Sequence, residues 1–139
     1  MGEPEVTERN QPIVDEFRAR GGVVGGSFEG IPLLLLTHTG ARTGHRRTSP
    51  VVYLDDGDHV LIFAGNGGSD RHPAWYHNIL ADPRVTVELG TETYEAKAVP
   101  LTGEQRDERY ARALAQFPAL ADLQERTARR IPLVALWRA

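Results

Sequence analysis

The chain has 139 residues, no cysteine and a formal net charge of −3. This length is typical of one domain, and 40% hydrophobic with 25% charged residues is close to the globular average, which argues against disorder. The lack of cysteine excludes a disulfide scaffold, a thiolate zinc site, an iron–sulfur cluster and a cysteine nucleophile. The acidic balance disfavours nucleic-acid binding through a general basic surface, so any anion site has to be local.

We expect no signal peptide in residues 1–9. Residues 1–9 are polar and acidic, lack the basic and apolar regions of a signal peptide, and are interpreted as a lead-in to a single domain over residues 10–139. No stretch approaches the roughly 20 apolar residues of a membrane span. We expect a cytoplasmic protein. Peripheral contact with a membrane stays open, and the oligomeric state is not indicated.

Proline and glycine residues indicate where the first helix begins and where regular structure is interrupted. A helix is predicted after Asn10, which can cap it, with Pro12 in its first turn. Residues 21–30 hold too much glycine for regular structure throughout. Residues 31–37 are an apolar run of strand length, although composition alone does not separate a strand from a short helix.

The middle of the chain predicts a hairpin and a short helix. A polar loop is expected over residues 39–47. Residues 51–54 and 59–64 flank an Asp-Asp-Gly-Asp turn, which is the clearest hairpin signal in the sequence. After a second glycine-rich loop, a short helix is predicted over residues 74–81.

The last part predicts another hairpin, two helices and a strand. The hairpin covers residues 85–99, and Thr102 then opens a capping box for a helix that Pro118 interrupts. A further helix is expected over residues 119–129 and a strand over residues 131–137. Two hairpins, two more strands and several helices predict an α+β fold with an antiparallel sheet or small barrel, and the lack of βαβ alternation disfavours a doubly wound fold.

Two glycine-bearing loops could bind a ligand. In residues 39–48, glycines let backbone amides turn toward one point, and Arg42, Arg46 and Arg47 add permanent positive charge, a combination that suits a phosphate. An ordinary solvated loop explains the same residues equally well. In residues 65–68, glycines could make a simple turn or let backbone amides approach a planar heterocycle.

Residues 72–78 combine two aromatic side chains, two histidines and an amide. His72 and His77 are five residues apart, about 140° around a helix, so they do not form a zinc pair. We predict no metal site and no catalytic side chain such as a nucleophile.

Seven segments, in this order, resemble the deazaflavin-dependent nitroreductase family, which includes F420H2-dependent quinone and enone reductases. They are residues 21–30, 33–37, 39–44, 47–50, 72–78, 81–83 and 130–132. The resemblance covers roughly residues 10–137, and its specificity lies in the ordered set.

This resemblance implies a split β-barrel, related to flavin-mononucleotide oxidases, and a reductase that uses reduced coenzyme F420. The cofactor carries a hydride and bears a phosphate and a glutamate tail, and the acceptor would be a small unsaturated, quinoid or nitro compound. The implied cofactor-binding residues are Ala41, Arg42, Thr43, Arg47, Thr48, Ser49, Pro50, Val51, Val52, Phe63, Ala64, Gly65, Asn66, Ala74, Trp75, Tyr76, His77 and Asn78.

Departures from the family pattern bear on the substrate. The phosphate loop has one basic residue fewer than is usual, and Val52 stands where a strand tyrosine can occur. Phe117, Leu120 and Leu123 occupy the region where nitroimidazole-reducing members carry tyrosines. An apolar pocket is therefore expected, suited to quinones, enones or lipid-like acceptors. Two alternatives stay open: a reductase that uses flavin mononucleotide (FMN), and a non-catalytic protein that binds deazaflavin, haem or a fatty acid.

Overall fold

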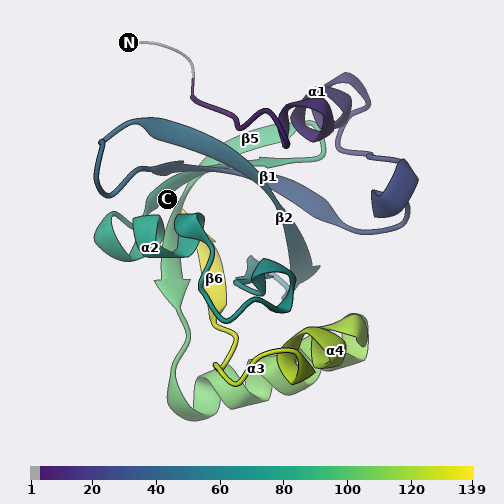
Figure 1. Ribbon diagram of the computed structural model, residues 1–139, viewed down its shortest axis with the longest axis vertical. Coiled ribbons are helices and arrows are strands. Elements are labelled where there is room, and N and C mark those ends of the chain that lie inside the picture. Colours follow the sequence, from purple (N-terminus) through teal and green to yellow (C-terminus); the bar gives the residue numbers. More distant parts are fainter. Residues whose placement is uncertain (1–3) are drawn as a thin grey trace.

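The computed structural model describes residues 4–139 and contains a closed antiparallel barrel of six strands in the order β1-β2-β3-β6-β5-β4 (Figure 1). The strands are β1 (Leu33–Thr39), β2 (Arg46–Asp55), β3 (Val60–Phe63), β4 (Arg84–Leu89), β5 (Glu92–Pro100) and β6 (Leu133–Arg138). The helices are α1 (Gln11–Ala19), α2 (Ala74–Ala81), α3 (Gly103–Gln116) and α4 (Ala119–Glu125), with 3-10 turns η1 (Gly26–Phe28) and η2 (Asn66–Gly68). The α+β barrel expected from the sequence is confirmed.

The leucine-rich strand β1 is buried on both faces. Leu34 and Leu36 pack inside the barrel, whereas Leu33 and Leu35 pack with the apolar side of α1. Side chains alternate between the faces of a strand, so a strand covered on both sides reads as a continuous apolar run. This double burial resolves the strand-or-helix ambiguity of residues 31–37.

Helices α3 and α4 cover a different part of the barrel from α1 (Figure 1). Leu61 and Leu133, from the adjacent strands β3 and β6, pack in one cluster with Leu120 of α4. This cluster and the one formed by Leu33, Leu35 and α1, here called the two outer clusters, therefore pack against the barrel from separate sides. No helix among residues 4–139 is long and apolar enough to cross a membrane.

Several boundaries differ from the sequence prediction. Strand β2 begins at Arg46, so the polar loop is only residues 40–45, because Thr39 pairs with Arg46 and the ladder continues through polar residues. Helix α4 ends at Glu125 instead of residue 129.

Both predicted N-terminal caps are wrong in their side-chain detail. Neither Asn10 nor Thr102 makes a side-chain capping hydrogen bond. The hydroxyl and carbonyl oxygens of Thr7 instead accept the Asn10 amide, at 3.3 and 3.0 Å. A turn over residues 7–10 therefore leads into α1.

Candidate functional site

The arginine-bearing loop between β1 and β2 is a tight turn. The Gly40 amide donates to the His45 carbonyl at 2.8 Å, and Gly44 has a φ of +73°, which favours glycine. A Cβ at Gly40 would lie 2.7 Å from the Thr43 hydroxyl oxygen. The two glycines thus let a six-residue loop close on a rigid strand pair.

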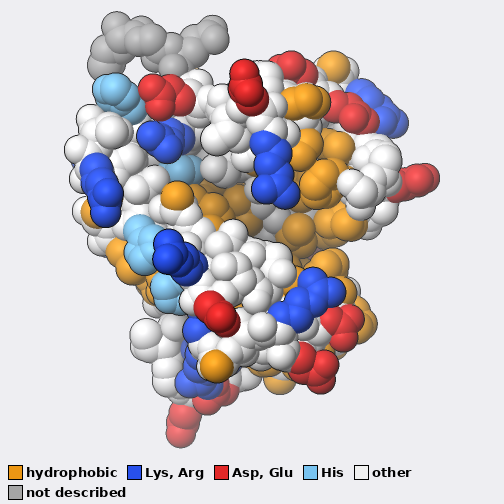
Figure 2. Space-filling view, in the orientation of Figure 1, with side chains coloured by type: hydrophobic (Ala, Val, Ile, Leu, Met, Phe, Trp, Pro, Cys, Tyr) orange, Lys and Arg blue, Asp and Glu red, His pale blue; other side chains and the backbone are white. Residues whose placement is uncertain are grey.

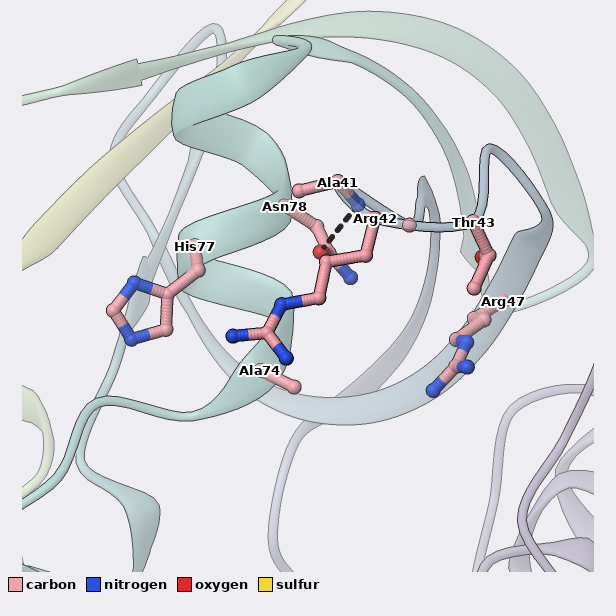
Figure 3. Close-up of a pocket in the computed structure, with 8 residues that line it drawn as sticks. Ala41, Arg42, Thr43, Arg47, Ala74, His77 and Asn78 are labelled. Carbon is pink, nitrogen blue, oxygen red and sulfur yellow. Dashed lines mark hydrogen bonds between the residues drawn. The ribbon is translucent and has the colours of Figure 1, made fainter.

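This loop and helix α2 enclose a cavity of about 330 Å³ (Figure 3). Arg42 and Arg47 extend on the same side of the loop in this view, whereas His77 points away from both. The wall also includes Ala74, at the start of α2. Two permanent cations line this one small cavity, which gives it the local positive charge that suits an anion.

Asn78 ties the loop to α2. Its Oδ1 accepts the Ala41 amide at 2.9 Å, and its Nδ2 lies 3.0 Å from Nδ1 of His38. His38 is 2% exposed, and burial, together with the charges of Arg47 and Arg46, lowers the pKa of its imidazole to about 4. The imidazole is therefore neutral at pH 7, and the loop rests on a buried, uncharged network.

A second cavity, of about 480 Å³, shares Arg47 and Ala74 with the first. It lies against the N-terminal segment, because Glu5 pairs with the β2 backbone through its amide and carbonyl groups. The Glu5 carboxylate is 3.6 Å from Nε of Arg47, beyond hydrogen-bond distance. That Nε is buried and has no hydrogen-bond partner among residues 4–139, so it is an unused donor beside the cavity.

The glycine loop after β3 presents further unused donors. No hydrogen bond from the Gly65 or Asn66 amide is found within the part of the chain that the structure describes. Asn66 has a φ of +48°, and its side chain closes the loop by donating to the Arg71 carbonyl at 2.9 Å. This loop can therefore offer two adjacent N–H groups to a ligand.

Apolar side chains lie across a hollow on the face of the molecule between α1 and the α3–α4 layer (Figure 2). Half-buried Val52 packs against both outer clusters, alongside Phe28 and Ile31 on the α1 side and Phe117 and Leu123 on the other. The residue that replaces the strand tyrosine thus lies where two apolar surfaces meet.

The structure brings together only some of the eighteen predicted cofactor-binding residues. Those that line the two cavities are Ala41, Arg42, Thr43, Arg47, Thr48, Ser49, Ala74, Trp75, His77 and Asn78. Those that line neither cavity are Pro50, Val51, Val52, Phe63, Ala64, Gly65, Asn66 and Tyr76. Val51 points into the barrel interior, and Phe63 packs on Phe117 with ring centres 5.6 Å apart.

Sequence reasoning missed three residues at the site. Glu5 reaches it only because the N-terminal segment pairs with β2, which no local pattern indicates. His38 carried a signal, since a histidine two residues after a run of four leucines needs partners if the buried strand continues through it. Arg129, discussed below, lay in a segment expected to be helix.

Comparison with known proteins shows the family to which the chain is similar. The family model described as F420H(2)-dependent quinone reductase matches residues 9–137. An F420H(2)-dependent quinone reductase of Mycobacterium tuberculosis is 38% identical over 128 residues, covering 88% of this chain and 85% of that protein. A putative F420H(2)-dependent quinone reductase of Mycobacterium bovis has the same identity and coverage.

Solved structures show the same architecture. A structure of an F420-H2 dependent reductase is 33% identical, with a TM-score of 0.69, and the match covers 76% of this chain and 93% of that one. A protein described as a domain-swapped dimer is 30% identical, with a TM-score of 0.70 and coverage of 93% and 94%. A haem storage protein from Vibrio cholerae shares the fold at 16% identity and a TM-score of 0.58.

Proposed function

The chain belongs to the F420H2-dependent quinone reductase family, and on that basis we propose that it transfers a hydride from reduced coenzyme F420 to a quinone-type acceptor. Enones and nitro compounds are related acceptors of the same proposal. The protein is thus an oxidoreductase whose cofactor is F420, and family membership disfavours FMN.

The buried Nε of Arg47 is the observation that carries the proposal furthest. It makes no hydrogen bond within the described chain, although the Glu5 carboxylate lies 3.6 Å away, and Arg47 and Arg42 line one cavity that can take a phosphate or carboxylate. A buried donor without a partner costs free energy, roughly 1–3 kcal/mol, which an anionic ligand would recover. The residues present therefore fit the phosphate and acidic tail of F420, with Thr43 adding a hydroxyl on the same wall.

The ring system would extend from this anion site along β2, past Thr48 and Ser49, toward the apolar hollow. Val52 and Phe117 offer apolar surface there, and the Gly65 and Asn66 amides offer hydrogen bonds to a polar ring edge. Trp75 and Ala74 would close the pocket from α2. The other predicted residues that line no cavity stay part of this proposal as packing around the ring.

Bound F420H2 supplies the hydride, and the chain supplies binding, orientation and exclusion of water. Arg42 and Arg47 would hold the anionic end, which would fix how far the rest of the molecule reaches along β2. Apolar side chains on both sides of Val52 would favour a flat, weakly polar acceptor and keep water from the transfer. We further propose that the acceptor is a small molecule, that the protein binds no nucleic acid, and that it is located in the cytoplasm.

Titration of the purified protein with F420 and with FMN, followed by fluorescence quenching, tests the cofactor. We expect a response to F420 at micromolar concentrations. Binding of FMN with no response to F420 would overturn the proposal.

Turnover of F420H2 with menadione separates an enzyme from a carrier. We expect loss of reduced cofactor in proportion to added quinone. Tight binding of F420H2 without oxidation by menadione or cyclohexenone would instead indicate a non-catalytic binding protein.

A further inference from the structure

Among residues 4–139, the side chain of Arg129 makes hydrogen bonds only to the glycine loop and the residues that flank it. Its Nε donates to the Ser69 carbonyl at 2.8 Å, Nη1 to the Ala64 carbonyl at 3.0 Å and Nη2 to the Gly65 carbonyl at 2.8 Å. Nη1 also lies 3.1 Å from Nδ1 of His72. One planar guanidinium therefore holds both ends of the loop, from a segment about 60 residues further along the chain.

These contacts help to set where the loop's free amides point, together with the Gly68 amide, which also donates to the Gly65 carbonyl, at 2.9 Å. In a trans peptide unit, the carbonyl of one residue and the N–H of the next point in opposite directions, and no cis peptide is found in the described chain. Because the Ala64 and Gly65 carbonyls face Arg129, the N–H groups of Gly65 and Asn66 face away from it. These are the two amides that lack a partner within residues 4–139.

His72 fits the same arrangement. Its Nδ1 faces a guanidinium N–H, so Nδ1 has to be the unprotonated acceptor. Burial and the charges of Arg129 and His77 lower the pKa of His72, which agrees with a neutral ring. The contact is the fourth made by the planar guanidinium, a geometry that a lysine could not reproduce.

We propose that Arg129 is a positioning residue that fixes the Gly65 and Asn66 amides as a paired donor for adjacent acceptor atoms on the edge of a planar ring. This inference rests on the proposed function for the identity of that ring, the deazaflavin of F420. Four of the five guanidinium N–H groups of Arg129 already have acceptors in the loop and in His72, so we assign it to positioning the loop and not to ligand contact.

The chain offers two matched controls. Arg130 is the neighbouring arginine, but it is exposed and pairs with Asp107. Arg106 is buried and donates to the Ile131 carbonyl, so it anchors the same segment without contacting the loop carbonyls that Arg129 binds. Arg130→Ala therefore controls for loss of a charge, and Arg106→Met controls for loss of stability.

The first experiment measures the affinity of Arg129→Ala, Arg129→Lys and both controls for two ligands. One is F420, and the other is its deazaflavin ribityl core, which lacks the phosphate and tail. We expect Arg129→Ala to weaken both ligands by a similar factor, roughly 10- to 100-fold for two lost hydrogen bonds. Arg129→Lys should weaken them less, and the controls should bind both normally.

Unequal effects on the two ligands, or an equal loss in Arg106→Met, would overturn the proposal. A second readout uses the ligand-free protein and does not depend on the cofactor. The amide NMR signals of Gly65 and Asn66 should shift or broaden in Arg129→Ala and Arg129→Lys but not in Arg130→Ala. If the wild-type protein binds neither ligand, the proposed function fails, and unchanged amide signals would then overturn the positioning role separately.

Discussion

The Asn78 side chain fixes the protonation state of His38. The Ala41 amide donates to Oδ1 of Asn78, so Nδ2 of Asn78 is the atom that faces Nδ1 of His38, 3.0 Å away. Nδ2 can only donate, which makes Nδ1 an acceptor and places the single ring proton on Nε2. The Nε2–H group faces the Ser49 hydroxyl oxygen, with 3.1 Å between Nε2 and Oγ. The Ala41 amide thus sets the orientation of the Asn78 side chain, and through it the tautomer of His38, which lines the second cavity.

The first prediction concerns stability at acid pH. The pKa of His38 is lowered from 6.5 to about 4 in the folded protein, so the unfolded chain binds more protons between these values. Stability should therefore be fully present above about pH 6.5 and fall as the pH drops toward about 4. The loss from this group is about 3 kcal/mol.

Urea unfolding of the wild type and of His38→Gln, at both ends of this range, measures the effect. Glutamine does not titrate, so the variant should lose less stability than the wild type on acidification. Equal losses in the two proteins would contradict the assignment to His38.

The second prediction reverses the charge environment of the same imidazole. In Asn78→Asp, a carboxylate replaces the amide that donates to Nδ1 of His38. An adjacent negative charge favours the protonated ring, so the pKa of His38 should rise. NMR titration of the ring signals measures the change, with His77→Gln on the exposed side of α2 as the control. An unchanged pKa would mean that the contact does not control the ring.

A third prediction tests the anion site. Arg42→Ala combined with Arg47→Ala should weaken F420 by several kcal/mol, since hydrogen bonds to charged groups contribute roughly 1.5–3 kcal/mol each. Arg84→Ala removes an exposed arginine paired with Asp82 and should leave the affinity unchanged. Fluorescence titration at low and high salt gives the comparison. Normal affinity in the double variant would show that the loop is only a connection between strands.

The fourth prediction compares two neighbouring glycines. Gly67 and Gly68 both have positive φ, +64° and +83°, but a Cβ at Gly68 would lie 2.7 Å from Cβ and Cδ of Arg126, whereas nothing lies near Gly67. Gly67→Ala should cost about 1–2 kcal/mol for the left-handed backbone. Gly68→Ala should cost more, because the loop then has to separate from the residue after α4. Thermal unfolding measures both, and equal losses would contradict the close approach.

The sequence was informative where a pattern is local. The turn around Gly57 and the doubly buried leucines of β1 follow from periodicity and turn chemistry, and both are present. The start of β2 was missed because Arg46 and Thr48 are polar, yet they continue a ladder whose register is set by β1. Pairing with a partner strand overrides local propensity at such positions.

The site was harder to predict than the fold. Arg42 and Arg47 stood out beside glycines, but the roles of His38 and Arg129 depend on groups about 40 and 60 residues away in the sequence. Arg129 was expected in a helix because its neighbours have helical composition. In the structure it lies beyond the end of α4, where its side chain binds loop carbonyls.

Strand β6 has a consequence for synthesis of the chain. It lies between β3 and β5, which are complete long before residues 133–138 are made. Until β6 leaves the ribosome, those two strands keep unpaired edges, the kind of surface on which nascent chains associate with one another. The barrel can therefore close only after residues 133–138 have been synthesised, because β6 fills the place between β3 and β5.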